Sequence, residues 1–483
     1  MKRLMTIVVA GAYLSSATSC KNAAGESDLL RFDPDKNGIE KIIELADGKT
    51  VKCRAYENIY YVANVVDSAY QYLNLYIPES AYDHHEKVPV FLKTNVGGYR
   101  AAKAGTPSAK DATGRALQEG YIVVIPGSRG SNSQILTDNG EVYTGKAPAG
   151  LIDLKAAIRY LRYNHAVLPG DTDCIITDGT SAGGAMSALL GATGNHPVYE
   201  PFLEELGAAS EQDDIFAAVC FCPITDLDHA DMAYEWLYQG TNTKGRALTP
   251  EQIEISDELA ALYPAYLNSL QLKTPDGTLL TDSNYREYVK SFLIASARRA
   301  KNAGAEIPED AGFIFDMDAH SSQKENITGL DLDTYLEYVV SKQVLKIPPA
   351  FDAMNVLSSR ATPENEVFGD QSGNAANFTD FSLQKATNNL NATLDPSIKE
   401  KVHIMNPMYY IGDSKSTTAP NWYIRHGAID RDTGFPVPIN LYTRLINQGY
   451  NADFELAWNK AHTGDYDLDN LFEWLNELIK NTR

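Results

Sequence analysis

Short apolar runs and helical patterns alternate along the first half of the chain. Residues 70–77 alternate apolar and polar side chains, as an antiparallel strand does, and residues 151–163 repeat apolar positions at helical spacing. Continuous apolar runs with a helix between them predict a mostly parallel sheet whose two faces are covered by helices. The predicted parallel strands lie at residues 88–94, 120–126, 173–178 and 214–223.

The pattern changes after residue 225 and returns near residue 419. Polar helix formers dominate residues 226–400, without strand–helix alternation, and a break or kink is expected at Pro264. We therefore predict an α/β core made of residues 30–225 and 401–483, with residues 226–400 inserted as a mainly helical cap. A separate second domain is disfavoured because the sheet pattern resumes afterwards. The later elements are helices at 257–272, 285–299, 332–346, 437–448 and 468–480, and strands at 419–427 and 454–458.

A glycine-flanked serine stands between a predicted strand and a predicted helix. Residues 179–183 read Gly-Thr-Ser-Ala-Gly, which is the Gly-x-Ser-x-Gly pattern of a nucleophile elbow in the context that it requires. The sharp turn exposes Ser181 as a nucleophile, and the helix that follows directs the amide of Ala182 toward a developing oxyanion. These features predict an α/β-hydrolase fold.

The serine needs a base and an acid, which this fold supplies in the order Ser, Asp or Glu, His. His462 lies between the last predicted strand and the last helix, where the base belongs, and His426 is a weaker candidate. The acid is expected after the preceding strand, where Asp430 and Asp432 both qualify and Asp430 is favoured by its position.

The oxyanion hole requires a second amide donor, from the loop after an early strand. Residues 97–99 read Gly-Gly-Tyr and form that loop. The backbone amide of Gly98 or that of Tyr99 is the expected donor, and the sequence does not choose between them.

The N-terminus and the charge indicate where the protein acts and which partners it avoids. Residues 1–19 combine a basic start, a short apolar run and small residues, which is typical of an export signal. Cys20 follows directly and predicts a lipid anchor, which would make the protein a periplasmic or cell-surface lipoprotein; simple secretion is the alternative. The net charge of −21 argues against nucleic acid as a partner, because an acidic surface repels phosphates.

The remaining cysteines do not form a disulfide framework. Of Cys53, Cys174, Cys220 and Cys222, we interpret Cys220 and Cys222, in an apolar run, as small buried residues; one disulfide from this pair to Cys174 or Cys53 is the alternative. No histidine or cysteine spacing fits a metal site, so no metal and no cofactor are expected. The polar segment 226–231 lacks the pattern of a calcium-binding loop and is interpreted as structural.

The chain resembles the bacterial tannases of the lactobacillus type and the feruloyl esterases related to them. The resemblance implies an α/β-hydrolase core with a large cap and the triad Ser181, Asp430 and His462. It differs from the fungal tannases, which have cysteines where this chain has Thr180 and Ala461. The resemblance rests on residues 95–99, 120–130, 179–184, 223–231, 346–352 and 425–435.

In the tannases, a Lys, a Glu and an Asp bind the hydroxyl groups of the galloyl ring. The matching residues here are Lys346, Glu364 and Asp432, with Glu366 as the alternative to Glu364. The resemblance therefore implies hydrolysis of a small phenolic ester, galloyl or a similar hydroxybenzoyl ester, through an acyl-enzyme. The alternatives are a feruloyl esterase or general carboxylesterase and, less favoured, a serine peptidase or a non-catalytic binding protein. The oligomeric state stays open.

Overall fold

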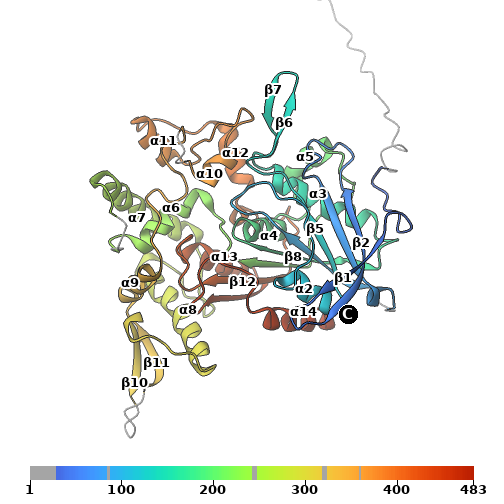
Figure 1. Cartoon of the computed structure of the whole chain (residues 1–483). Coiled ribbons are helices and arrows are strands. Elements are labelled where there is room, and N and C mark those ends of the chain that lie inside the picture. Colours follow the sequence, from blue (N-terminus) through green and yellow to red (C-terminus); the bar gives the residue numbers. More distant parts are fainter. Residues whose placement is uncertain (1–28, 84–86, 242–246, 318–323, 358–360, 483) are drawn as a thin grey trace, which may run out of the picture.

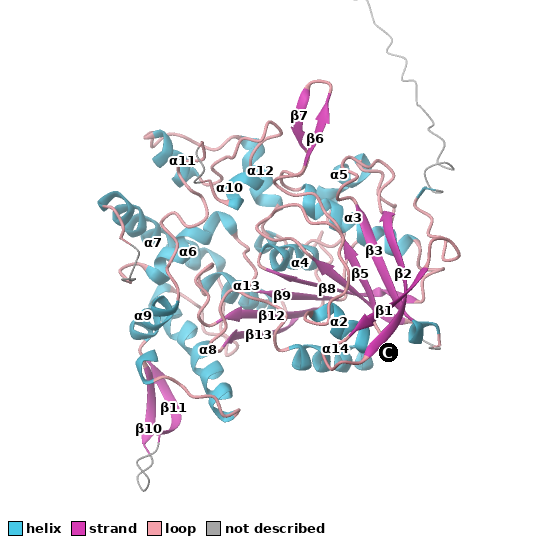
Figure 2. Ribbon diagram, in the orientation of Figure 1, coloured by secondary structure: helices cyan, strands magenta, loops and turns pink. Residues whose placement is uncertain are grey.

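A computed structural model describes residues 29–83, 87–241, 247–317, 324–357 and 361–482. The predicted signal segment and Cys20 lie outside these residues. A nine-stranded sheet forms the centre of the molecule (Figures 1 and 2). In spatial order its strands are β1 (Ile39–Glu44), β2 (Thr50–Tyr60), β3 (Tyr72–Pro78), β5 (Ile122–Pro126), β4 (Val88–Thr94), β8 (Gly170–Thr180), β9 (Ala217–Phe221), β12 (Asn421–Gly427) and β13 (Asn451–Ala457).

The sheet is parallel from β5 to β13, and β1, β2 and β3 pair antiparallel at one edge. The predicted α/β-hydrolase architecture is confirmed, including the antiparallel character of β3. β1 and β2 were not predicted from the sequence. Two hairpins were also not predicted, β6 (Gln134–Thr137) with β7 (Gly140–Tyr143) and β10 (Phe313–Met317) with β11 (Lys324–Leu330).

Side chains alternate between two hydrophobic cores on opposite faces of the sheet. On β4, Val90 and Leu92 pack into one core, and Phe91 between them packs into the other. The first core includes α3 (Ala149–Tyr163) and α4 (Ala182–Ala192), and the second includes α2 (Ala112–Gln118) and α14 (Leu468–Thr482). Helices on both faces explain why the central strands are apolar on both sides.

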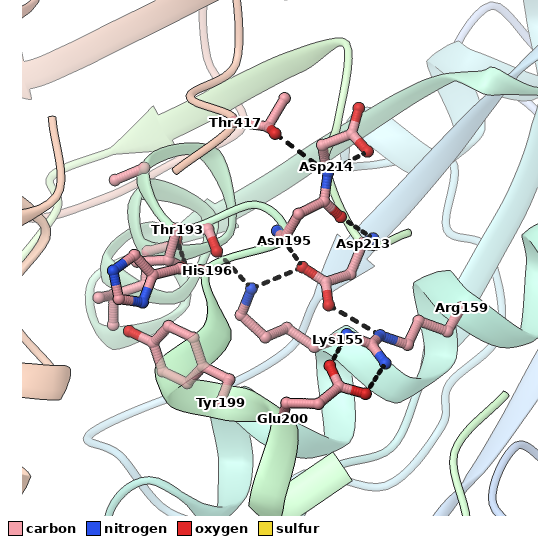
Figure 3. A network of polar contacts seen from close by, with 12 residues as sticks. Lys155, Arg159, Thr193, Asn195, His196, Tyr199, Glu200, Asp213, Asp214 and Thr417 are labelled. Atoms are coloured by element: carbon pink, nitrogen blue, oxygen red, sulfur yellow. Dashed lines mark hydrogen bonds and ion pairs between the residues drawn. The ribbon is translucent and has the colours of Figure 1, made fainter. Parts of the chain in front are cut away.

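A buried polar network joins α3 to the segment that leads into β9 (Figure 3). Lys155 is fully buried and its ammonium lies 2.8 Å from Oδ1 of Asp213. Arg159 binds the other oxygen of Asp213 at 2.9 Å and also pairs with Glu200. Burial raises the pKa of Asp213, but the charges of Lys155 and Arg159 outweigh burial and hold it below its ordinary value.

The chain leaves the sheet after β9 and returns to it at β12. The intervening segment packs on the carboxyl end of β12, where the hydroxyl of Tyr335 donates to the carbonyl of Ala428 at 2.7 Å. Its elements are α6 (Leu227–Tyr238), α7 (Pro250–Leu270), α8 (Asp282–Asn302), β10, β11, α9 (Leu332–Lys342), α10 (Pro363–Val367), α11 (Asp380–Thr387) and α12 (Pro396–Ile404). α13 (Pro436–Asn447) follows β12.

Two helices in this segment differ from their predicted bounds. α7 runs without a break through Pro264 and starts earlier than expected, because Thr249 caps it with a capping box to Gln252. α9 ends at Lys342 instead of continuing to Lys346, so Lys346 lies in the loop that follows. Within the described part of the chain, no helix is long and apolar enough to cross a membrane.

Candidate active site

Ser181 occupies a strained turn between β8 and α4. Its backbone has φ 62° and ψ −125°, a conformation that non-glycine residues adopt only where the surrounding structure enforces it. A Cβ atom on Gly179 would lie 2.1 Å from Thr94 Oγ1 and 2.3 Å from the carbonyl oxygen of Gly183. The glycine is therefore required for the close packing that holds the turn.

Asp430 and His462 are in direct contact. Asp430 follows β12, His462 follows β13, and Nδ1 of His462 lies 2.7 Å from Oδ2 of Asp430. The other carboxylate oxygen of Asp430 accepts a hydrogen bond from the backbone amide of Asp432 at 2.7 Å. Of the two acids that the sequence left open, the structure brings Asp430 against the histidine.

The charges around His462 favour its protonated form. Burial lowers the pKa of His462, but the hydrogen bond to Asp430 and the charges of Asp430 and Asp432 raise it above its ordinary value. Burial raises the pKa of Asp430, yet His426 and His462 together hold it below its ordinary value. The carboxylate is thus arranged to stay ionised while the histidine takes up a proton.

His426 and Cys222 lie next to the Asp430–His462 pair. His426 is fully buried and its Nε2 lies 3.7 Å from Oδ2 of Asp430, so it faces the carboxylate from the protein interior. The thiol of Cys222 donates to the carbonyl of Thr463 at 3.2 Å, next to His462.

All four cysteines in the described part of the chain are free and buried, so the alternative of a disulfide to Cys174 or Cys53 is wrong.

The loop after β4 turns sharply at Gly98 and Tyr99. Gly98 and Tyr99 both have positive φ, at 53° and 54°. The hydroxyl of Tyr99 donates to the carbonyl of Ile224 at 2.7 Å, which fixes the loop against the segment after β9. The amides of Gly98 and Tyr99 both stay candidates for the second donor, beside the amide of Ala182 at the start of α4.

Lys346 and Asp432 interact electrostatically with both Glu364 and His462. The charge of Lys346 lowers the pKa of Glu364 and the charge of Asp432 raises it, while burial is the largest effect and leaves it above its ordinary value. The charge of Asp432 also raises the pKa of His462, and the charge of Lys346 lowers it. The ammonium of Lys346 lies 4.1 Å from the centre of the Phe351 ring. Lys346 and Asp432 thus link Glu364 and His462 in one group of interacting charges.

Glu366, the alternative to Glu364, points elsewhere. Its carboxylate is 40% exposed and lies 3.7 Å from the guanidinium of Arg100, whereas Glu364 is 5% exposed. Both residues belong to α10, where positions two apart differ by about 200° around the axis. Only Glu364 therefore joins the group with Lys346 and Asp432.

The segment 226–231 holds a compact cluster of Asp226, Asp228 and His229. Their ligand atoms lie within 4.8 Å of one another, which would suit a metal ion. However, Nδ2 of Asn406 donates to both carboxylates at 2.7 Å, and Tyr266 donates to Asp226 at 2.5 Å. Because protein donors bind these oxygens, the cluster fits the structural interpretation.

One ionic link near the site was not predicted from the sequence. The ammonium of Lys93 lies 2.5 Å from Oδ2 of Asp178 and 2.8 Å from Oδ1 of Asp465. The signal was a lysine inside the apolar run of β4, but its partners are 85 and 372 residues away.

A serine on a strained elbow and a histidine–carboxylate pair after the last two strands define an α/β-hydrolase.

Comparison with known proteins identifies the branch of that class. The family model BD-FAE matches residues 73–268. The tannase of Fusobacterium nucleatum has 38% identity and a TM-score of 0.83, with 93% of this chain and 99% of that one covered. The tannin acyl hydrolase of Lactobacillus plantarum has 38% identity and a TM-score of 0.84, with 94% and 99% covered. A tannin acyl hydrolase solved in complex with ethyl gallate gives the same values.

Shorter matches agree with this result. Esterase LipQ of Mycobacterium tuberculosis is 33% identical over 90 residues, which are 19% of this chain and 20% of that protein. This chain therefore covers only about a fifth of the length of that curated relative. The chain belongs to the bacterial tannase family and is a carboxylic ester hydrolase.

Proposed function

We propose that the protein hydrolyses galloyl esters, or esters of similar hydroxybenzoic acids, with Ser181 as the covalent nucleophile. The observation that carries this proposal is the group of Lys346, Glu364 and Asp432 beside His462. A related tannin acyl hydrolase has been solved with ethyl gallate bound, which supports the same class of substrate here.

In the proposed reaction, Oγ of Ser181 attacks the ester carbonyl and His462 takes the serine proton. The amides of Ala182 and of the Gly98–Tyr99 loop hold the oxyanion of the tetrahedral intermediate. His462 then protonates the leaving alcohol, which gives the acyl-enzyme. Water, deprotonated by the same histidine, releases the acid. Asp430 keeps the imidazole oriented and stabilises its positive charge throughout.

The charged group explains how a hydroxylated ring would be selected. A trihydroxyphenyl ring is flat and apolar, but its edge carries donors and acceptors. The carboxylates of Glu364 and Asp432 accept from ring hydroxyls, and the ammonium of Lys346 donates to one. Because Glu364 is buried, a ring without hydroxyls would leave it unpaired, and this penalty gives specificity.

Ferulate esters are the second candidate substrates, because the BD-FAE family model, which fits the feruloyl esterases, matches residues 73–268. Hydrolysis of methyl gallate and methyl ferulate, compared as kcat/KM, separates the two. Asp432→Ala and Glu364→Ala are each expected to lower kcat/KM for methyl gallate. The expected loss corresponds to about 1–3 kcal/mol of transition-state binding free energy. The loss on phenyl acetate should be much smaller. Asp333→Ala, on the exposed face of α9, serves as the control.

Equal losses on both kinds of ester would show that Glu364 and Asp432 support the triad or the fold and do not recognise the ring. Preference for methyl ferulate over methyl gallate would replace the galloyl assignment with the feruloyl one.

We further propose that residues 1–19 direct export and that Cys20 is acylated and begins the mature protein. The support is the sequence pattern of a basic start, a short apolar run and a cysteine. Detergent partitioning and intact mass of the protein from its native host test this. A product without an acyl mass increase would contradict it.

A further inference from the structure

His426, near the end of β12, is completely enclosed by the protein. Its side chain has no exposed surface, and the ring of Phe435 packs edge-on against it with centroids 6.0 Å apart. Within the described part of the chain, neither nitrogen of the imidazole has a hydrogen-bond partner. Buried polar groups are nearly always paired, so an unpaired imidazole beside a candidate catalytic pair indicates a task other than packing.

The imidazole of His426 faces the carboxylate of Asp430. Nε2 of His426 lies 3.7 Å from Oδ2 of Asp430, the same oxygen that lies 2.7 Å from Nδ1 of His462. The carboxylate is itself fully buried, and its other oxygen accepts from the backbone amide of Asp432. Two imidazoles therefore approach one carboxylate oxygen, and they differ in access: His462 is 18% exposed, whereas His426 is not exposed.

The surroundings of His426 keep it neutral. Burial lowers its pKa and the charge of His462 lowers it further, which outweighs the raising effects of Asp430, of the Thr433 backbone and of Asp432. A neutral imidazole carries a single N–H. With that hydrogen on Nδ1, the lone pair of Nε2 would face the negative carboxylate. The arrangement therefore favours the tautomer in which Nε2 carries the hydrogen.

We propose that His426 is a positioning residue of the catalytic pair: its Nε2–H points at the buried carboxylate of Asp430 and stabilises the negative charge there as a dipole. A cation in this place would neutralise Asp430 and weaken its attraction for the proton that His462 takes up. With no donor in this place, burial would act against the ionised carboxylate, and a protonated Asp430 would no longer stabilise the imidazolium. The inference rests on the proposed catalytic roles of Asp430 and His462.

Two amide substitutions test the inference because they carry a donor to different points. The side-chain NH₂ of Gln reaches about as far as Nε2 of histidine, whereas that of Asn reaches only about as far as Nδ1. His426→Gln should keep kcat for phenyl acetate within about threefold of wild type. His426→Asn and His426→Leu should each lower it about tenfold, the loss of one hydrogen bond or dipole to a buried charge. KM should change little, because the side chain is enclosed.

A double-variant cycle with Asp430→Asn separates positioning from support of the fold. Asp430→Asn alone should lower kcat by several decades, on the order of 10⁴. Once a neutral amide replaces the carboxylate, no negative charge remains for His426 to stabilise. His426→Asn should therefore lower kcat by less than about twofold in the Asp430→Asn background, against about tenfold in the wild type. A residue that only supports the fold would lower kcat by the same factor in both backgrounds.

His196→Asn is the matched control, because His196 is another largely buried histidine beside an aspartate. Its side chain is 9% exposed and its Nε2 lies 3.4 Å from Asp413, in the network of Figure 3. This variant should leave kcat unchanged. Urea unfolding of every variant shows whether it is folded, and the Gln and Asn variants decide the question if His426→Leu does not fold.

Equal losses in His426→Gln and His426→Asn would overturn the inference, as would the same factor in both backgrounds of the cycle. A large loss in Asp430→Asn with none in His426→Asn would overturn the inference alone and leave the catalytic pair in place. Near-normal kcat in Asp430→Asn would instead overturn the catalytic role of Asp430, and the inference with it. Recovery by Gln but not by Asn, together with the loss of the effect in the Asp430→Asn background, supports the proposal.

Discussion

Lys93→Met removes one ammonium that joins the two halves of the candidate catalytic machinery. Asp178 stands three residues before Ser181, Asp465 stands three residues after His462, and Lys93 binds both carboxylates. The link connects the nucleophile strand with the loop that carries the base. Methionine keeps most of the volume of the side chain and removes only the charge and the hydrogen bonds.

The expected loss follows from the burial of the partners. Asp178 is fully buried and Lys93 is 9% exposed. Removal of one partner from a buried ion pair costs about 3–5 kcal/mol, because it leaves the other charge without compensation. Asp178 can reduce this cost by taking up a proton, since burial already raises its pKa to about 7 against the lowering effect of Lys93. Without Lys93 the pKa of Asp178 rises further.

The raised pKa of Asp178 fixes the direction in which the free energy of unfolding changes with pH. A carboxyl group whose pKa is raised by folding favours the protonated folded state, and stability falls as the pH rises through the raised value. The deficit of Lys93→Met relative to wild type should therefore be smallest near pH 5 and largest near pH 9. Lys93→Met/Asp178→Asn should recover more than half of the deficit, because the buried charge is then absent.

Urea unfolding at pH 5, 7 and 9 measures the free energies, and kcat for methyl gallate reports on the alignment of Ser181 and His462. Lys290→Met is the control, since Lys290 pairs with Glu287 at the surface of α8. Unfolding free energies of Lys93→Met within about 0.5 kcal/mol of wild type at every pH would refute the reasoning. A double variant no more stable than the single one would refute it as well.

Other expected outcomes concern the triad and its neighbours. Ser181→Ala and His462→Ala should each lower kcat by about 10³ to 10⁶, with the double variant scarcely worse, and full activity of either would contradict the mechanism. Asp432→Asn should move the acid limb of kcat/KM for phenyl acetate to lower pH, because Asp432 raises the pKa of His462; an unmoved limb would disagree. His229 has its pKa raised to about 10 by Asp226 and Asp228 against the effect of burial. Its contribution to stability is thus complete below pH 6.5 and lost toward pH 10, so His229→Gln should destabilise by about 2 kcal/mol or more at pH 6 and little at pH 10, as urea unfolding would show.

The central sheet was predictable because its strands are buried on both faces. Val88–Thr94 and Ala217–Phe221 are buried at every position, so the apolar runs were visible without any tertiary information. β1 has the sequence Ile-Glu-Lys-Ile-Ile-Glu and is exposed at most positions, as an edge strand with one neighbour can be. Such a strand owes its existence to pairing with β2 and carries a weak signal of its own.

The contact between Asp430 and His462 was predictable, because chain order and local position decide it. The place of His462 after the last strand and of Asp430 after β12 follows from the topology of the fold. The choice between Glu364 and Glu366 was not predictable, because it depends on the orientation of α10, whose first turn is set by the cap of Thr362. Two residues only two positions apart then face different spaces.

The residues proposed to act on the ester bond come from the core, whereas most of those proposed to bind the aromatic ring come from the insertion. Ser181, Asp430 and His462 follow strands of the sheet, so the parallel register that stacks β8, β9, β12 and β13 also aligns the three. Lys346 and Glu364 lie in the inserted segment, whose packing on the core involves contacts such as that of Tyr335 with Ala428. Substitutions in the insertion can therefore change which ester is bound while the chemistry at the strand ends is retained. This is the physical reason why fold and reaction could be inferred from short motifs, while the ester has to be established by experiment.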